Sequence, residues 1–340
     1  MARYIPILRF MRGERVGIQR LSQARRANVA PLFVLAPKQY VGKKATQKHP
    51  AIPAPDAIAN ELMTCWGTAP FFLDASALPA GAQHPIVDIA AAARNIGLAM
   101  IPAAPLASPL PYQHGVNSVV GTDHRGIGLR VDLTQVSSAN LWSTQWPFPL
   151  PATDLIIDIS DNAPMVATLG AAVTNVIQTL HQGASWRTRT IAGTSMPDNF
   201  SGLISGTHTI ARSEWSIWQH LTAAGLLYSL DYGDYATVPT VPPPAGIKWG
   251  FPINVRYTLA NQFLICRGVP TTGYGAVDMG PQLMGHAQSI VAHSGRGPLA
   301  NCWGDTEIDG IANGAAPQGL EHWVQISVNR HLELVRNLLP

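Results

Sequence analysis

The sequence has few cysteines, and their arrangement argues against most cysteine-based architectures. Cys65, Cys266 and Cys302 lie far apart among the 340 residues and form no CxxC pair. An odd number of widely spaced cysteines supports neither a disulfide framework nor a cysteine-rich zinc site. We therefore expect buried thiols in a reducing compartment.

Charge and long hydrophobic runs are also scarce. Charged residues form 13% of the sequence, compared with about a quarter of an average soluble domain. No stretch approaches the roughly 20 apolar residues of a membrane span, and the first residues lack the features of a signal peptide. Because 46% of the residues are hydrophobic, we expect a large core and a surface that is partly apolar or covered by a partner. The sequence predicts a cytosolic protein without membrane attachment.

The basic residues are concentrated before residue 50. They are Arg3, Arg9, Arg12, Arg15, Arg20, Arg25, Arg26, Lys38, Lys43, Lys44 and Lys48. One interpretation is a basic N-terminal face that binds the phosphates of a nucleic acid or of another ligand. The other is a solvent-exposed helix face followed by a basic loop. The sequence leaves both open.

Short apolar runs recur along the first two thirds of the chain and predict eight strands. These are Tyr4–Arg9, Val29–Leu35, Pro70–Leu73, Leu98–Pro102, Gly126–Val131, Asp154–Ile159, Thr188–Ala192 and Leu226–Leu230. Most are continuous rather than alternating, which is typical of parallel strands buried on both faces. Segments with helical spacing lie between them, including Gly13–Arg26, His84–Asn95, Ala163–Leu180 and Thr207–Ala224. Eight such units in about 230 residues predict an α/β fold, a (β/α)8 TIM-like barrel.

An open doubly wound sheet would fit the same strands. It is disfavoured because the chain lacks a glycine-rich phosphate turn: Gly126 and Gly128 begin a strand instead of following one.

A different pattern follows residue 237. Residues 238–250 form a proline-rich stretch that predicts an extended connection. Ile253–Leu259 and Gln262–Arg267 then predict a hairpin, and helices are expected near Gly280–His293 and Val324–Leu339. We expect a barrel core over residues 1–237, the connection over 238–250, and a C-terminal hairpin with helices over 251–340 packed on the barrel.

An aspartate follows four of the predicted strands, namely Asp74, Asp132, Asp158 and Asp231. The carboxyl ends of the strands of a βα barrel form one rim, where catalytic groups lie. Arg9, Lys38 and Arg130 are expected near the same rim and would bind an anionic group. Carboxylates held close together suit general acid catalysis or cation binding. The alternative for each aspartate is that it caps the following helix.

A second group of polar residues lies in apolar surroundings. Arg212 and Glu214 precede one predicted strand, and Asp234 and Tyr235 follow it. They are either a buried ion-pair network or ligand-binding residues. The histidines show no metal-ligand spacing, since His286 and His293 are seven residues apart. The sequence therefore indicates no metal site and no particular cofactor.

Several short motifs occur in a defined order along nearly the whole chain. They are Tyr4-Ile-Pro-Ile-Leu8, Gly13-Glu14, Arg212-Ser-Glu214, Tyr232-Gly-Asp-Tyr235-Ala236, Val255-Arg256-Tyr257, Arg267-Gly268, Trp303-Gly-Asp305, Trp323 and Asn329-Arg330-His331. This series resembles the beta protein family of phages, prophages and bacterial mobile islands. Asn329-Arg330-His331 departs from the paired histidines expected at that point, which puts a catalytic role of the segment in doubt. The resemblance implies a component of a phage–host conflict or anti-phage defence system.

Three functions are consistent with these features. The first is an enzyme that acts on a phosphorylated or nucleotide-like ligand through the four aspartates. The second is a non-catalytic sensor or scaffold that binds a protein partner from the same locus. The third is a nucleic-acid-binding protein that uses the basic N-terminal face.

Overall fold

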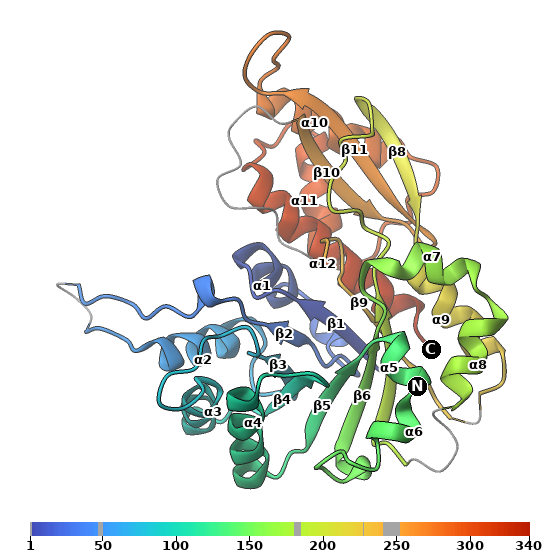
Figure 1. Cartoon of the computed structure of the whole chain (residues 1–340). Helices are drawn as coiled ribbons and strands as arrows, with labels where there is room; N and C mark the ends of the chain where they lie inside the picture. Colours follow the sequence, from blue (N-terminus) through green and yellow to red (C-terminus); the bar gives the residue numbers. More distant parts are fainter. Residues whose placement is uncertain (1, 47–49, 180–184, 227, 241–251) are drawn as a thin grey trace.

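The larger part of the protein is a closed barrel of eight parallel strands, β1-β2-β3-β4-β5-β6-β7-β9 (Figure 1). The computed structural model describes residues 2–46, 50–179, 185–226, 228–240 and 252–340. The barrel strands are β1 (Tyr4–Leu8), β2 (Leu32–Val34), β3 (Phe71–Asp74), β4 (Met100–Pro105), β5 (Ile127–Val131), β6 (Thr153–Asp158), β7 (Thr188–Gly193) and β9 (Asp231–Asp234). The predicted (β/α)8 barrel is confirmed.

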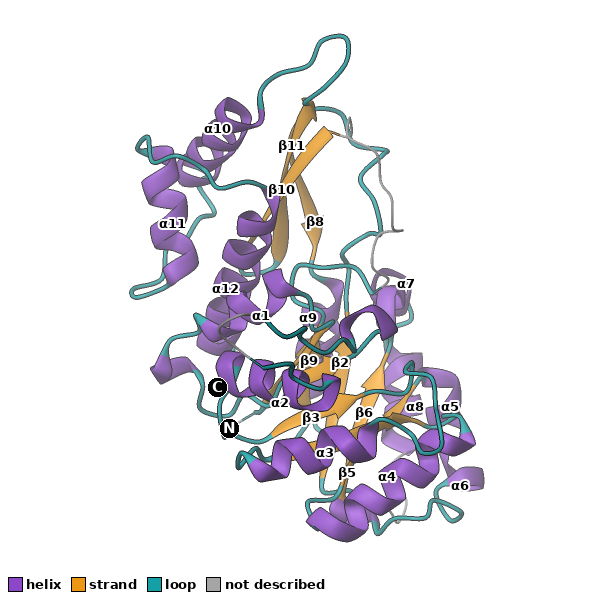
Figure 2. Ribbon diagram, turned by 90° about the vertical axis from the view of Figure 1, so that its left-hand side faces the viewer, coloured by secondary structure: helices purple, strands orange, loops and turns teal. Residues whose placement is uncertain are grey.

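Helices surround the barrel strands and cover their outer faces (Figures 1 and 2). They are α1 (Arg12–Gln19), α2 (Ala54–Cys65), α3 (Ile86–Asn95), α4 (Leu110–Asp123), α5 (Leu133–Ser137), α6 (Ala139–Trp142), α7 (Ala163–Thr168), α8 (Ala171–Thr179) and α9 (Ser213–Ala223). Among the described residues, no helix has both the length and the hydropathy needed to cross a bilayer.

Two separate apolar clusters explain why the strands are continuous hydrophobic runs. One cluster joins outward-facing strand residues such as Leu73, Leu129 and Leu155 to the helices. The other lies inside the barrel and contains Ile5, Ile7, Leu32, Phe72, Ala103, Ile156 and Ala192. Because successive residues of a strand point to opposite faces, both sets must be apolar when a sheet is closed and covered.

A three-stranded antiparallel sheet of order β10-β11-β8 lies at one end of the barrel (Figures 1 and 2). Its strands are β8 (Gly206–Ala211), β10 (Pro252–Thr258) and β11 (Gln262–Pro270), and the accompanying helices are α10 (Met279–Ala292), α11 (Trp303–Ala312) and α12 (Leu320–Leu338). The predicted hairpin is therefore present. Most of the predicted proline-rich connection lies outside the described residues.

Two predicted elements are wrong. The eighth barrel strand is Asp231–Asp234, not Leu226–Leu230, because pairing with β1 and β7 places the polar segment in the barrel wall. The first five residues of the predicted helix Thr207–Ala224 belong to strand β8, whose partner in the hairpin lies far away in sequence, with Thr207 opposite Cys266. Tertiary pairing overrides local pattern in both cases.

The predicted helix Ala163–Leu180 is interrupted. It divides into α7 and α8 at Gly170, which has a φ of +42°. Glycine tolerates this left-handed backbone, which a helix interior does not adopt.

Helix α12 joins the two parts of the molecule. Trp323 and Ile326 belong to the core of the three-stranded sheet, whereas Leu332 and Val335 belong to the outer core of the barrel. The helix packs closely on α1, where a Cβ atom on Gly17 would lie 2.8 Å from the Cβ of Val328. Glycine in α1 therefore permits this helix–helix approach.

We expect Gly17→Ala to destabilise the protein by about 1–3 kcal/mol, because the added methyl group overpacks the contact with Val328. Urea denaturation gives the change in the free energy of unfolding. The matched control is Gly121→Ala in α4, where an added Cβ would meet nothing within 4 Å. That variant should be neutral or more stable by about 0.5–1 kcal/mol, since alanine favours a helix. Equal effects of the two substitutions would contradict the role of Gly17.

Candidate functional site

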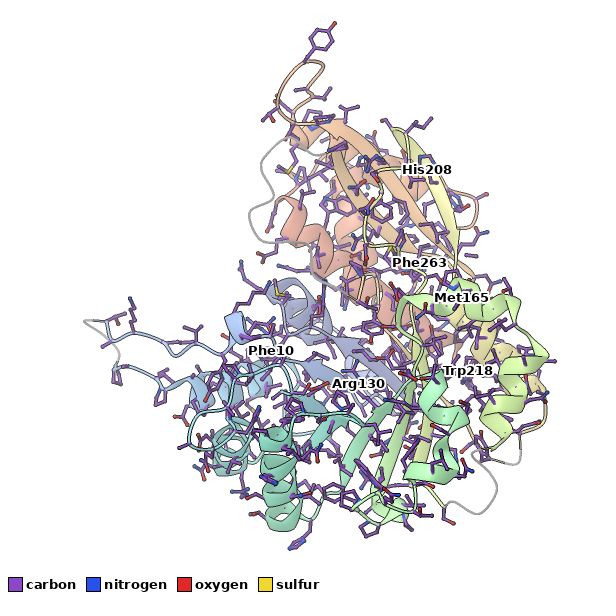
Figure 3. All side chains as sticks on the ribbon, in the orientation of Figure 1. Phe10, Arg130, Met165, His208, Trp218 and Phe263 are labelled. Carbon is purple, nitrogen blue, oxygen red and sulfur yellow. The ribbon has the colours of Figure 1, made fainter. Side chains whose placement is uncertain are left out.

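Four side chains meet inside the barrel at the carboxyl ends of its strands, and we call them the rim cluster: Asp74, Arg130, Asp158 and Tyr235. Arg130 Nη1 lies 2.5 Å from Asp74 Oδ2, and Arg130 Nη2 lies 2.6 Å from Asp158 Oδ2. The Tyr235 hydroxyl donates to Asp158 Oδ2 at 2.5 Å. Arg130 is labelled in Figure 3. The structure thus brings together two of the four predicted aspartates with a predicted arginine and the predicted tyrosine.

The second oxygen of each rim aspartate is used in a turn. Asp74 Oδ1 accepts a hydrogen bond from the Ser76 N–H, and Asp158 Oδ1 accepts one from the Ser160 N–H, both at 2.9 Å. Each carboxylate therefore orders the turn after its strand and also pairs with Arg130. At these two positions, an aspartate that orders a turn also points toward the rim.

The pKa values of Arg130 and Tyr235 keep the first charged and the second neutral. Burial acts to lower the pKa of Arg130, but the charges of Asp158 and Asp74 raise it well above the ordinary value. Burial and the charge of Asp158 raise the pKa of Tyr235, whose hydroxyl stays protonated and donates. The cluster consequently presents a fixed set of hydrogen bonds at neutral pH.

Three other predicted rim residues do not join the rim cluster. Asp132 is exposed and caps α5 by accepting from the Gln135 N–H at 2.8 Å. Lys38 is exposed in the 3₁₀ turn Pro37–Gln39. Asp231 begins β9 and therefore lies at the amino end of the barrel, so its predicted position beyond a strand is wrong. There it accepts from the Arg3 N–H at 2.8 Å.

Two arginines, Arg9 and Arg256, form what we call the basic pair near the rim. Arg9 follows β1 and pairs with the buried Glu14, with 2.9 Å between Arg9 Nη2 and Glu14 Oε1. Arg256 comes from β10, and its Nη1 donates to the Thr237 carbonyl at 2.6 Å. Burial and the charge of Arg9 lower the pKa of Arg256 to about 10. The charge of Arg9 thus acts against the charge of Arg256.

Arg256 was not among the candidate site residues derived from the sequence. The alternation of side chains along β10 could have indicated Arg256, because Val255 and Tyr257 on either side of it are buried in the core of the sheet. A residue between them must point to the other face. Its guanidinium lies 5.2 Å from the ring centroid of Phe200, in the β7–β8 connection. Which face meets the barrel depends on tertiary structure.

Arg212, Glu214, Asp234 and His331 form a second, fully buried group, the junction network. Asp234 Oδ2 lies 2.7 Å from His331 Nε2 and 4.0 Å from Arg212 Nη2, and Arg212 Nε lies 3.5 Å from Glu214 Oε1. All four side chains are at most 1% exposed. They join β9, α9 and α12, so three predicted ligand-binding residues lie in a structural joint between the barrel and the three-stranded sheet.

Adjacent residues of one strand end thus serve different sites. Asp234 faces outward into the junction network, whereas Tyr235 faces the barrel interior, because consecutive side chains point to opposite faces. Burial acts to raise the pKa of Asp234, but His331, Arg212 and the Tyr4 hydroxyl lower it below the ordinary value. Asp234 is therefore charged in the folded protein.

We expect the junction network to make the protein less stable below about pH 6.5. Burial lowers the pKa of His331, although Asp234 opposes this effect. The unfolded chain therefore binds a proton near pH 6.5 that the folded chain does not bind until a lower pH, so unfolding is favoured as the pH falls. His331→Gln should reduce the slope of unfolding free energy against pH by up to about 1.4 kcal/mol per pH unit.

The measurement is urea denaturation between about pH 5 and pH 7.5, since His titrates in this range. The control is His114→Gln, which changes an exposed histidine and should leave the slope unchanged. An unaltered slope in His331→Gln would show that this histidine is not responsible.

Further motif residues also lie in buried contacts. Asp305 accepts from the Tyr257 hydroxyl at 2.9 Å and pairs with Arg330 at 3.2 Å. Asn329 accepts from the Gly304 N–H at 2.9 Å and donates to the Gly17 carbonyl at 3.2 Å. These residues hold α11, α12 and α1 together, which is a structural role.

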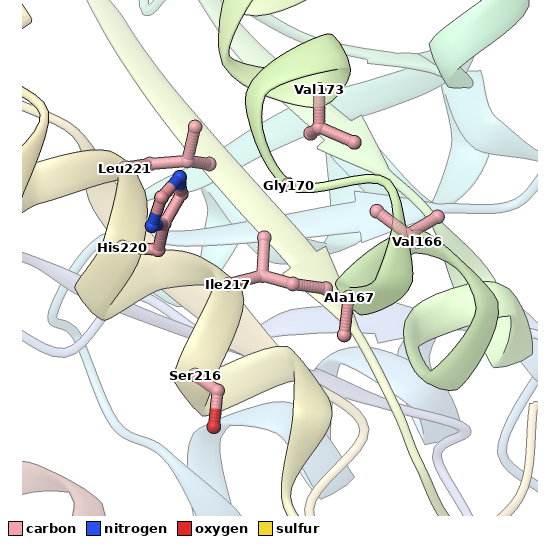
Figure 4. Close-up of a pocket in the computed structure, with 8 residues that line it drawn as sticks. All are labelled: Val166, Ala167, Gly170, Val173, Ser216, Ile217, His220 and Leu221. Carbon is pink, nitrogen blue, oxygen red and sulfur yellow. The ribbon is translucent and has the colours of Figure 1, made fainter.

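A hollow on the outside of the barrel lies between α7, α8 and α9 (Figure 4). Its volume is about 210 Å³, and its walls include Val166, Val173, Ile217 and His220. None of the candidate site residues lines it. The hollow is therefore separate from the residues that the sequence indicated.

The comparison with known families covers both parts of the molecule. The family model described as Beta protein matches residues 4–336, a range that includes the rim cluster, the basic pair and the junction network. No curated protein matches the sequence. Because the match spans nearly the whole chain, from β1 to the last turns of α12, the chain belongs to the Beta protein family.

Proposed function

We propose that the protein binds a small anionic ligand, carrying phosphate or carboxylate, at the basic pair beside the barrel rim. The observation that carries this proposal is the charge balance around Arg9 and Arg256. Two guanidinium groups lie there beside one carboxylate, that of Glu14. Within the described structure, Arg9 Nη1 is buried and has no hydrogen-bond partner.

An anion would relieve both features of this arrangement. Like charges held close together are unfavourable, and the lowered pKa of Arg256 reflects burial and, after it, that repulsion. Guanidinium groups bind phosphate and carboxylate oxygens through paired N–H donors. A bound anion would therefore supply the acceptors and the negative charge that the basic pair needs.

The rim cluster has a supporting part in this proposal. Asp74 and Asp158 both pair with Arg130 and each orders a turn, so they are better suited to fix the shape of the rim than to take a proton from a ligand. Catalysis through these aspartates is the less direct proposal, because it requires a ligand that displaces Arg130. The resemblance to phage and mobile-element proteins suggests that the ligand belongs to a phage–host conflict or defence system.

We expect Arg256→Gln to abolish stabilisation of the protein by inorganic phosphate. Wild-type protein should melt at a higher temperature in phosphate than in chloride of equal ionic strength, because a ligand that binds the folded state shifts the unfolding equilibrium. Lys38→Gln removes an exposed positive charge and serves as the control, which should retain the full shift. The proposal fails if Arg256→Gln and wild type respond equally.

A scaffold function is favoured by one observation. At the end of the three-stranded sheet away from the barrel, Tyr274 is fully exposed and Ile204 is 79% exposed. Contiguous exposed apolar side chains mark binding surfaces, and we propose this end of the sheet as the place where a partner would dock. A stable complex with a protein encoded nearby, measured by size-exclusion chromatography with light scattering, would support it. Loss of the complex in Tyr274→Ser would assign it to this surface.

Nucleic-acid binding has less support. The early basic residues pair with carboxylates on several elements, including Arg12 with Glu321, Arg15 with Glu61 and Arg25 with Glu333. Paired arginines spread over different elements do not form the continuous basic face that nucleic-acid binding requires.

A further inference from the structure

A pocket with aromatic walls lies on the outside of the barrel and is separate from the rim cluster. We call it the ring pocket. Its volume is about 230 Å³, and it is bounded by α4, by the end of β4 and by the segment from Trp142 to Phe148. Both α4 and α6 are on the outer surface of the barrel (Figure 2). The pocket shares no lining residue with the rim cluster or the basic pair.

The tryptophans of the ring pocket are held in position by their own polar atoms. Trp142 Nε1 donates to the Gln135 carbonyl at 2.7 Å, and Trp146 Nε1 donates to Thr153 Oγ1 at 3.1 Å. Trp146 also contacts Phe148, with ring centroids 5.3 Å apart at an interplanar angle of 59°. The indole N–H groups are used inside the protein, so the rings offer the pocket only their apolar surfaces.

These rings are nevertheless not buried in the core. Trp142, Trp146 and Phe148 are all of intermediate exposure, whereas Trp215, Trp218 and Trp323 are almost completely buried. Large aromatic side chains that keep an accessible face beside a cavity are suited to stacking on a ligand ring. The position of the pocket, between α4 and a loop, was not indicated by the sequence.

Apart from Ser108, the polar residues of the lining are amides. Gln113, Asn117 and Gln145 contribute side chains to the pocket, and the described lining contains no charged residue. Gln113 Nε2 donates to the Ser108 carbonyl at 2.6 Å, which fixes that side chain and leaves its carbonyl oxygen as an acceptor. Amides offer donors and acceptors without charge, so they match a neutral ligand with both kinds of group on its edge.

From these features we infer that the ring pocket binds a flat, uncharged heterocycle of the nucleobase kind. The volume is smaller than the roughly 300–1,000 Å³ of pockets for drug-sized ligands, which fits a one- or two-ring compound. A proline-rich peptide is disfavoured, because neither indole N–H, of Trp142 or of Trp146, is free to donate to a peptide carbonyl. This inference is independent of anion binding at the rim.

The test uses adenosine as the probe and intrinsic tryptophan fluorescence of the full-length protein as the readout. Adenosine should quench the fluorescence saturably, and ribose should not. Trp146→Leu should weaken binding at least about tenfold, in line with the loss of one stacked ring. Trp146→Phe should lose less, because it retains an aromatic face. Trp303→Phe changes a tryptophan on α11, outside the pocket, and should bind adenosine as wild type does.

A second variant tests the inference even if the Trp146→Leu protein misfolds. Asn117 is exposed on α4, so Asn117→Leu should fold normally, as its melting temperature would show, and should also weaken adenosine binding. The inference is overturned if adenosine gives no saturable quenching, if Trp146→Leu and Asn117→Leu both bind it as tightly as wild type, or if a proline-rich peptide binds in the pocket and adenosine does not.

Discussion

Replacing Arg130 with methionine is expected to destabilise the protein by about 3–5 kcal/mol, because it breaks a buried ion-pair cluster by removing one partner. Asp74 and Asp158, with 2% and 10% of their side chains exposed, would then share the barrel interior without a positive charge between them. The loss should appear in urea denaturation as a lower midpoint with an unchanged slope.

The matched control for Arg130→Met is Arg94→Met. Arg94 lies 2.6 Å from Asp123, the same separation as between Arg130 and Asp158, but its side chain is 43% exposed. Solvent screens such a pair, so the expected loss is about 0–1 kcal/mol. If both variants lose the same free energy of unfolding, burial does not determine how much the rim cluster stabilises the protein. Its assigned role would then be wrong.

Replacing Asp234 with alanine should have an effect of similar size, about 3–5 kcal/mol. Arg212, which is fully buried, would keep Glu214 at 3.5 Å as its remaining carboxylate. The Tyr4 hydroxyl and His331 would each lose a hydrogen-bond partner at 2.7 Å. Unsatisfied buried polar groups are costly in addition to the lost ion pair. Thermal and urea denaturation both report the change.

Asp132→Ala is the comparison for Asp234→Ala. Asp132 is exposed and caps α5, so its loss should cost about 1 kcal/mol, as for other N-caps. A small effect of Asp234→Ala, close to that of Asp132→Ala, would mean that the junction network does not hold the two parts of the molecule together.

The two predictions concern neighbouring sites. Tyr235 belongs to the rim cluster and Asp234 to the junction network, so a change in the backbone at the end of β9 moves both. The basic pair spans the same boundary, since Arg9 follows a barrel strand and Arg256 comes from the three-stranded sheet. An anion bound between them would therefore contact both parts of the protein.

Much of the fold was predictable because the hydrophobic effect acts on local runs of sequence. The first seven barrel strands are short apolar segments, and each lies close to its predicted position. The eighth strand was displaced because Asp231-Tyr-Gly-Asp234 is polar in sequence. It occupies the wall of the barrel because its backbone pairs with β1 and β7. Its two aspartates also have polar partners, since Asp231 contacts Arg3 and Asp234 contacts His331.

The candidate site was predictable only in part. Position after a strand indicated Asp74, Asp132, Asp158 and Asp231 equally. The register of the strands places these four aspartates in different surroundings. Asp74 and Asp158 lie within reach of Arg130, Asp132 points to solvent as a cap, and Asp231 lies at the opposite end of the barrel. Arg256 and the ring pocket depend on contacts between segments far apart in sequence.

The sequence by itself determined the class of fold, the hairpin and the residue types available at the rim, because hydrophobic periodicity and strand-end position are local properties. Only the tertiary structure decided which side chains meet. A one-residue change of register turns a side chain to the other face of a strand, and pairing across the barrel sets that register. Asp234 is therefore part of a buried joint, whereas Tyr235, the next residue, is part of the candidate site.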